Sequence, residues 1–312
     1  MAGDAVGGVD YPRTFQEFQA WFPNEDACLD YLETLRWPDG FVCPVCECRD
    51  AWRTAGRLFM CTACSRKTSV TAGTIFHRSH TSISTWFAAV WFVTSQKNGV
   101  SALGLQNVLG FGSYETAWAW MHKLRRAMVR PEREQLSGVV ELDETLVGGA
   151  STGQLGVSGE NKVPVLVAVE RLANGRLGRV RFDIGQRPGS KKLLTFAEDS
   201  IAKGSLIRTD GAIFLRQLPS MGFKHEYSTG YDSLDKDQEL PGVHLVASLL
   251  KRWIAGTLQH RVSDKHLAYY LDEFAFRFNR RTSRARGMLF YRLLQQAVNT
   301  DPHPLEDLIH AS

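Results

Sequence analysis

The sequence predicts an α/β protein in which a cysteine-rich segment and a helical region precede a larger domain of strands and helices. Three observations lead to this prediction: two Cys-x-x-Cys pairs near the N-terminus, a run of amphipathic segments after them, and strand-like segments that begin at Val139. With 312 residues, 44% of them hydrophobic, the chain is long enough to bury a substantial core.

Residues 1–36 are predicted to be an N-terminal helical segment. Apolar side chains recur at helical spacing between Phe15 and Arg36, which fits one amphipathic helix or two short ones. Cys28 lies within this segment, so we expect it to be a core residue rather than a metal ligand.

The cysteine pairs lie in a second predicted domain, residues 37–78. Each pair places two thiolates on one side of a tight loop, and two such loops can hold a zinc ion in a tetrahedral site, as in a zinc ribbon. Four thiolates leave no open coordination position, so the predicted zinc is structural. Cys48 could compete for the site. The predicted ligands are Cys43, Cys46, Cys61 and Cys64.

A third predicted domain, residues 79–134, reads as three helices. Ser84, Ser101 and Ser113 are the N-cap candidates of the three helices, and the glycine-rich run 110–112 marks a turn before the last one. A helix-turn-helix would present residues 113–116 to a DNA groove. A purely structural three-helix bundle is the alternative that the pattern leaves open.

Basic side chains gather in two stretches, although the net charge is only +4. One stretch holds Lys123, Arg125 and Arg126, and the other runs from Lys251 to Arg292. Such clusters either neutralise phosphates or form solvated helix faces. The N-terminus lacks a signal-peptide pattern, and the most apolar segment is too short for a membrane span. We therefore expect a cytoplasmic protein without a membrane partner.

Strands dominate the chain from Val139 onward. Asp143 lies within the first predicted strand, and Asp210 directly follows the last one. If these strands are neighbours in one sheet, the two carboxylates can face each other and hold a divalent cation such as Mg²⁺. An ordinary Asp-Gly turn is the other interpretation of Asp210. The predicted strands are 139–147, 163–169, 177–184 and 206–209, with a helix over 191–202.

A helix that begins near residue 241 offers a third metal ligand. His244 and Lys251 are about two helical turns apart, so they lie on one face of this helix. The imidazole could bind the metal, and the ammonium group could bind a phosphate of the cleaved strand. The alternative for His244 is an ordinary histidine at a helix start.

Together these segments resemble bacterial insertion-sequence transposases of the DDE class, in the ISXO-type branch that carries an N-terminal zinc ribbon. The resemblance covers nearly the whole chain. It depends on the paired cysteine motifs, on Glu-Leu-Asp-Glu-Thr at 141–145, on Arg-Thr-Asp-Gly at 208–211, on Leu-Lys-Arg-Trp at 250–253, and on residues 270–281.

The resemblance implies an RNase H-like mixed sheet flanked by helices in residues 135–300, followed by a tail, 301–312. It implies that Asp143 and Asp210 are the first two catalytic acids and that Lys251 is the trailing basic residue. It also implies a double-stranded DNA partner, comprising terminal repeats and target DNA, a nucleoid location, and a homodimer or higher oligomer in the DNA complex.

The third acid of the family is where this sequence departs. The Glu or Asn of relatives falls on His244, or in another register on Leu249. Imidazole binds Mg²⁺ poorly and Mn²⁺ better, so His244 could replace it as a ligand of Mg²⁺ or Mn²⁺. Glu144 and Glu239 are outside candidates, and the loop 150–162 is less basic than in relatives.

The sequence therefore predicts a DNA transposase with structural Zn²⁺ and catalytic Mg²⁺ or Mn²⁺. It would cleave insertion-sequence ends and transfer the strands into target DNA. The alternative is a catalytically decayed or domesticated transposase that acts as a DNA-binding protein.

Overall fold

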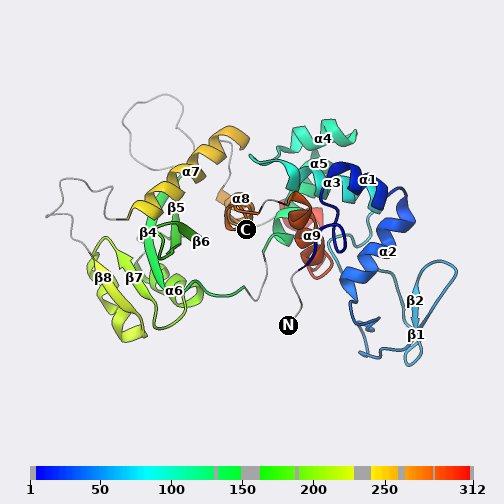
Figure 1. The fold of residues 1–312 in the computed structure, drawn as a ribbon, viewed down its shortest axis with the longest axis horizontal. Helices are drawn as coiled ribbons and strands as arrows, with labels where there is room; N and C mark the ends of the chain where they lie inside the picture. The colour runs from blue at the N-terminus through cyan, green and yellow to red at the C-terminus, as the bar shows by residue number, and fades with distance from the viewer. Residues whose placement is uncertain are drawn as a thin grey trace. The chain divides into compact units, whose positions relative to one another are not determined.

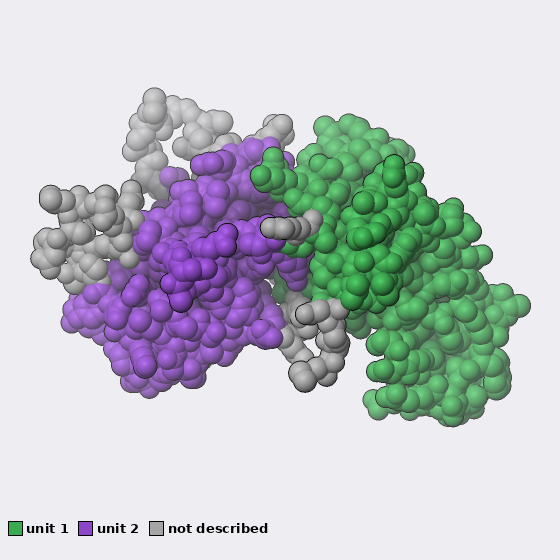
Figure 2. Space-filling model, viewed as in Figure 1, with its two compact units in different colours: residues 1–130, 283–311 green, residues 131–282, 312 purple. Residues whose placement is uncertain are grey.

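The computed structural model of the chain describes residues 5–129, 133–148, 162–186, 190–227, 240–258, 264–283 and 285–309. The chain forms two compact units, coloured separately in Figure 2. Unit 1 combines residues 1–130 with residues 283–311, and unit 2 consists of residues 131–282. No helix among the described residues is long and apolar enough to cross a membrane.

Unit 1 is mainly helical and carries one small antiparallel sheet. The predicted helical segment 1–36 forms two helices, because Asn24 interrupts it and caps the second helix through a hydrogen bond from the N–H of Ala27. The elements are α1 (Phe15–Trp21), α2 (Glu25–Arg36), β1 (Ala51–Arg53), β2 (Phe59–Cys61), β3 (Lys67–Thr68), α3 (Ile83–Ser95), α4 (Ala102–Leu109), α5 (Tyr114–Ala127), α9 (Arg286–Ala297) and α10 (Leu305–Ile309).

The three helices α3, α4 and α5 begin at serine caps, as predicted, but one cap is shifted. Ser101 and Ser113 cap α4 and α5. For α3 the cap is Ser82 rather than Ser84, and its hydroxyl accepts a hydrogen bond from the N–H of Thr85. Ser84 cannot cap because it lies inside the first turn, where its N–H donates to the carboxylate of Glu25.

The helix α9 completes the core of unit 1. Its Phe290 is fully buried and packs edge-on against Phe18 and Phe87, with ring centroids 5.5 and 5.6 Å away. Gly287 lies so close to Pro12 that an added Cβ would sit 1.6 Å from the Pro12 carbonyl oxygen. The predicted domain 135–300 therefore differs from unit 2, which ends at residue 282, because the aromatic face of α9 is buried in unit 1.

Unit 2 is built on a mixed five-stranded sheet of order β6-β5-β4-β7-β8 (Figure 1). The pairs β6–β5 and β5–β4 are antiparallel, whereas β4–β7 and β7–β8 are parallel. The predicted strands are present, and β8 is an addition at the edge. The elements are β4 (Val139–Val147), β5 (Val163–Arg171), β6 (Leu177–Ile184), α6 (Ser190–Ser200), β7 (Leu206–Thr209), the 3-10 helix η1 (Ile213–Met221), β8 (Lys224–Tyr227), α7 (Pro241–Leu258) and α8 (Asp264–Asn279).

Helices cover both faces of this sheet, which confirms the predicted fold class. Val140 and Leu142 of β4 point to the face that packs against α6 and η1. Val147 points to the opposite face, which packs against α7 and α8. Because side chains alternate along a strand, Asp143 lies on the same face as Val147 and therefore faces the layer that contains α7.

Candidate functional site

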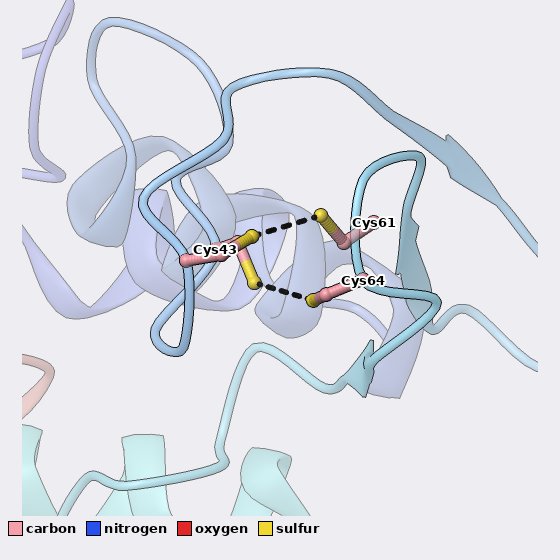
Figure 3. A group of neighbouring side chains, drawn as sticks. Cys43, Cys61 and Cys64 are labelled. Atoms are coloured by element: carbon pink, nitrogen blue, oxygen red, sulfur yellow. Dashed lines mark hydrogen bonds between the residues drawn. The ribbon is translucent and has the colours of Figure 1, made fainter.

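The four predicted zinc ligands converge in unit 1. Their sulfur atoms all lie within 4.8 Å of one another. The Sγ atoms of Cys43 and Cys64 are 3.6 Å apart, and those of Cys46 and Cys61 are 3.5 Å apart (Figure 3). These distances exceed a disulfide bond but are close to the edge of about 3.8 Å that a tetrahedron with 2.3 Å Zn–S bonds requires. The chemistry and spacing of this donor set therefore fit a structural zinc ion.

Two of these thiols have shifted pKa values of opposite direction. Hydrogen bonds from the backbone N–H groups of Val45 and Cys46 lower the pKa of the Cys43 thiol to about 6, which favours the thiolate form that zinc needs. The neighbouring thiols of Cys64 and Cys61 raise the pKa of Cys46, because close sulfur atoms oppose a second negative charge. Cys48 takes no part in the sulfur cluster, since its thiol contacts Thr62 and the backbone oxygen of Asp50. Cys28 is fully buried, as predicted.

The small sheet is joined to α2 by ion pairs at the surface. Arg53 lies 2.5 Å from Glu33, and Arg57 lies 2.6 Å from Asp26. Exposed pairs of this kind add little stability. These two arginines of the ribbon therefore already form ion pairs with acidic residues of the same chain.

In unit 2 the parallel pairing of β4 and β7 leads toward the two predicted acids. The paired residues end with Glu141 opposite Arg208, two residues before Asp143 and Asp210. The charge of Asp210 contributes to the raised pKa of Asp143, as expected for neighbouring carboxylates.

Asp143 is the more buried of the two acids. Burial raises its pKa to about 6, and the neighbouring charge of Asp210 adds to the rise. Two groups lower the pKa again: the backbone N–H of Glu144, which donates to Oδ1 of Asp143 at 2.7 Å, and the ring of His244. A carboxylate in this setting gains stability when a cation lies between it and its like-charged neighbour.

Asp210 is exposed at the end of β7, and its loop is held by short contacts. The Oδ1 atom accepts a hydrogen bond from the N–H of Ala212 at 3.2 Å. The buried hydroxyl of Thr209 lies 2.9 Å from Nε2 of His225 and accepts the N–H of Gly211. These contacts fix the backbone on both sides of the carboxylate.

The first turn of α7 brings His244 close to Asp143. Its Nε2 atom lies 3.9 Å from Oδ2 of Asp143, and 39% of its side chain is exposed. Lys251 is exposed on the same helix, about two turns farther along. The alternative register position, Leu249, is partly buried and packs into the core beneath α7, so it is not at the acidic site.

Among the described residues, only the cysteines bring three or more ligand atoms within 4.8 Å of one another. The Asp143, Asp210 and His244 group is therefore more open than the cysteine cluster. Glu144 lies on the opposite side of β4 from Asp143 by strand alternation. Glu239 and residues 150–161 of the loop 150–162 lie outside the described residues.

The candidate DNA-contacting residues divide into exposed and internal ones. Tyr114, Glu115 and Thr116 are exposed at the start of α5, as the helix-turn-helix prediction requires. Arg126 is also exposed. Arg125 is buried, with 2% of its surface accessible, so it fits neither of the two interpretations of this basic run, phosphate binding or a solvated helix face.

The C-terminal basic stretch is also partly internal. Arg277 pairs with the fully buried Glu273 at 2.7 Å. Arg280 and Arg281 stack on Phe276 and Phe278, and Arg281 donates to backbone carbonyls at the start of β6. Arg277 and Arg280 are partly buried, whereas Arg281 is exposed, as are Lys251 and Arg252 on α7.

One residue of this region was not singled out from the sequence. Glu141 lies two residues before Asp143 and is 2% exposed. Its Oε2 accepts a hydrogen bond from the N–H of Val243 at 2.9 Å, and its Oε1 lies 3.3 Å from Nε of Arg171. A charged residue inside a buried strand was the signal that could have revealed it.

Two known families match the regions that contain the two candidate sites. Residues 23–67, which include all four cysteines of the cluster, match the transposase zinc-ribbon domain. Residues 135–279, which span β4 to α8, match the ISXO2-like transposase domain. No curated protein matches the chain. The chain is therefore built from a transposase zinc-ribbon domain followed by an ISXO2-like, DDE-type transposase domain.

Proposed function

We propose that the chain is an active DNA transposase that cleaves the ends of an insertion sequence and joins them to target DNA. The observation that supports this most is the parallel register of β4 and β7, whose last pair lies two residues before Asp143 and Asp210, with His244 of α7 3.9 Å from Asp143. The family implies transposition, and this arrangement of acids is what the chemistry of transposition requires.

The two carboxylates and His244 would hold Mg²⁺ or Mn²⁺. A divalent cation at such a site supplies Lewis-acid activation of the attacking oxygen and stabilises the leaving oxygen. Carboxylate oxygens suit Mg²⁺, whereas the imidazole nitrogen shifts the preference toward Mn²⁺. The raised pKa of Asp143 supports this assignment, because a bound cation would restore the charged carboxylate.

Two phosphodiester reactions follow from this proposal. In the first, a water oxygen bonds to the phosphorus at the element end and the 3′ oxygen leaves as a hydroxyl. In the second, that 3′-hydroxyl attacks a phosphorus of the target, and a target 3′ oxygen leaves. Lys251, exposed on the same helix face as His244, would bind a phosphate of the reacting strand.

The zinc ribbon and the exposed start of α5 would contact the DNA outside the cleaved bond. The zinc is structural in this proposal, since four thiolates complete its coordination. Two element ends must be held together for joining, so we expect two or more copies of the chain in the DNA complex.

The proposal is tested with the full chain and a labelled duplex that carries the inverted repeat flanking the gene. Cleavage and strand transfer are followed on denaturing gels in Mg²⁺ and in Mn²⁺. We expect both reactions in the wild type, more strongly in Mn²⁺, and their loss in Asp143→Ala. Asp199→Ala, an exposed acid on α6, is the matched control and should retain activity. A wild type that binds this duplex but cuts it with neither cation would contradict the proposal.

The presence of His244 at the third-ligand position favours a second candidate, a DNA-binding protein that has lost catalysis. The variant His244→Glu separates the two. If it reduces an existing Mn²⁺-dependent activity, the imidazole is a working ligand. If it creates activity in a wild type that has none, the decayed transposase is the correct description.

A further inference from the structure

Glu141 is a charged side chain held out of water beside the proposed metal site. It projects from the same face of β4 as Asp143, two residues earlier, and only 2% of it is exposed. Two positive groups offset its charge there. One is Arg171, 3.3 Å away, and the other is the N-terminal end of α7, which carries the positive end of the helix dipole.

The start of α7 needs an acceptor from outside its own sequence. The first N–H groups of a helix have no partner within the helix. Pro241 has no N–H, and the preceding Leu240 has a side chain that cannot accept a hydrogen bond. The N–H of His244 bonds to the Leu240 carbonyl, whereas the N–H of Val243 donates to Oε2 of Glu141 at 2.9 Å. Glu141 thus caps α7 from the neighbouring strand.

Gly242 allows this close approach. A Cβ added there would lie 2.7 Å from Oε2 of Glu141 and 3.0 Å from Leu177. A larger residue would displace the Glu141 carboxylate, the first turn of α7, or both. The next residues along this turn are Val243, which is bonded to Glu141, and His244, whose ring lies 3.9 Å from Asp143.

We infer that Glu141 is a positioning residue that fixes the first turn of α7 against β4 and thereby sets the distance between His244 and Asp143. This inference rests on the proposed function, because it takes His244 and Asp143 as ligands of one cation. Glu141 itself does not contact the metal or DNA in this account.

The test is a double-mutant cycle that measures Mn²⁺ affinity of the zinc-loaded full chain by titration calorimetry. Outer residues that orient metal ligands typically change metal affinity by about 10–100-fold, so Glu141→Ala should weaken Mn²⁺ binding by about tenfold or more. In a His244→Ala background the same change should have an effect of less than about twofold, because the residue through which Glu141 acts is absent. Glu141→Gln, which keeps an acceptor for the Val243 N–H, should remain within about threefold of wild type.

Gly242→Ala perturbs the contact between Glu141 and the first turn of α7 without removing the carboxylate. This variant replaces Glu141→Ala in the test if Glu141→Ala does not fold. It should weaken Mn²⁺ binding in the wild type but not in the His244→Ala background. Gly256→Ala is the matched control on the same helix, because an added Cβ there meets nothing within 4 Å. Hydrogen exchange of the peptide covering residues 240–244 reports the cap itself and should increase in Glu141→Ala and Gly242→Ala only.

The possible outcomes distinguish this inference from the proposed function. Equal losses of Mn²⁺ affinity in both backgrounds would mean a general structural role and would overturn the positioning role. A Glu141→Gln variant as weak as Glu141→Ala would overturn it too. A wild type without Mn²⁺ binding or DNA cleavage would overturn the metal site, and the inference with it, even if hydrogen exchange confirmed the cap.

Discussion

Replacing Asp143 by asparagine should stabilise the protein in the absence of metal while abolishing its activity. Burial and the neighbouring Asp210 raise the pKa of Asp143 from an ordinary 3.8 to about 6. Only 25% of this side chain is exposed, so solvent screens the effect weakly. A rise of about two units corresponds to about 3 kcal/mol that the folded state loses when the carboxylate ionises.

The pH dependence of this effect has a definite direction. Because the pKa in the folded protein lies above that in the unfolded chain, the protonated form favours folding. Its stabilisation is fully present below about pH 4 and is lost as the pH rises through about 6. Asp143→Asn, which stays neutral, should therefore raise the free energy of unfolding by about 3 kcal/mol at pH 7.5 and by less than about 1 kcal/mol at pH 4.

The measurement is hydrogen exchange of the buried strand β5 in EDTA, which gives the free energy of opening of unit 2 at each pH. Asp199→Asn is the control and should change little, because Asp199 is exposed. Adding Mn²⁺ should reverse the order, since the cation stabilises the wild type and not the variant. An Asp143→Asn variant that is no more stable than wild type at pH 7.5 would refute the reasoning.

Three further predictions concern the rest of the chain. Cys61→Ser should remove the bound zinc, which elemental analysis detects as a loss of one equivalent per chain, and unfold the ribbon; retained zinc would exclude this site. Phe290→Ala should destabilise unit 1 by about 3–5 kcal/mol in urea titrations, because this ring is fully buried, whereas the half-exposed Phe15→Ala should have a smaller effect. DNA affinity should fall steeply between 50 and 200 mM salt, on the order of a thousandfold for about six phosphate contacts, and a flat response in binding assays would contradict phosphate contact.

Most of the sheet was predictable because its strands carry a simple pattern. The strands β4, β6 and β7 match the predicted ranges, since apolar β-forming residues recur along each of them. The edge strand β8 was not predicted, because its four residues, Lys224–Tyr227, are polar and mostly exposed. Such a strand forms through pairing with β7, which no local pattern reveals.

The candidate ligands could be chosen from the sequence, but their structural surroundings could not. Asp143, Asp210 and His244 stand out as titratable groups near strand and helix ends, and their roles as ligands stay predictions. The structure adds that His244 lies 3.9 Å from Asp143 and that β4 pairs with β7 up to two residues before the two acids. The role of Glu141 as a cap depends on Val243, which is distant in sequence, so it required the tertiary structure. The burial of Arg125 could not be predicted either, since a basic run does not show which side chains turn inward.

The helix α9 follows unit 2 along the chain but belongs to unit 1, so unit 1 depends on residues from both ends of the chain. A chain that ended after α8 would keep every candidate metal ligand of both sites, because all of them precede Thr282. It would nevertheless lack Phe290, which contacts Phe18, Phe87 and Trp91 in the core of unit 1. The family match to the transposase domain ends at residue 279, before α9 begins. Unit 1 therefore cannot be separated from the transposase domain by a single cut, since its core is completed only after the chain has passed through unit 2.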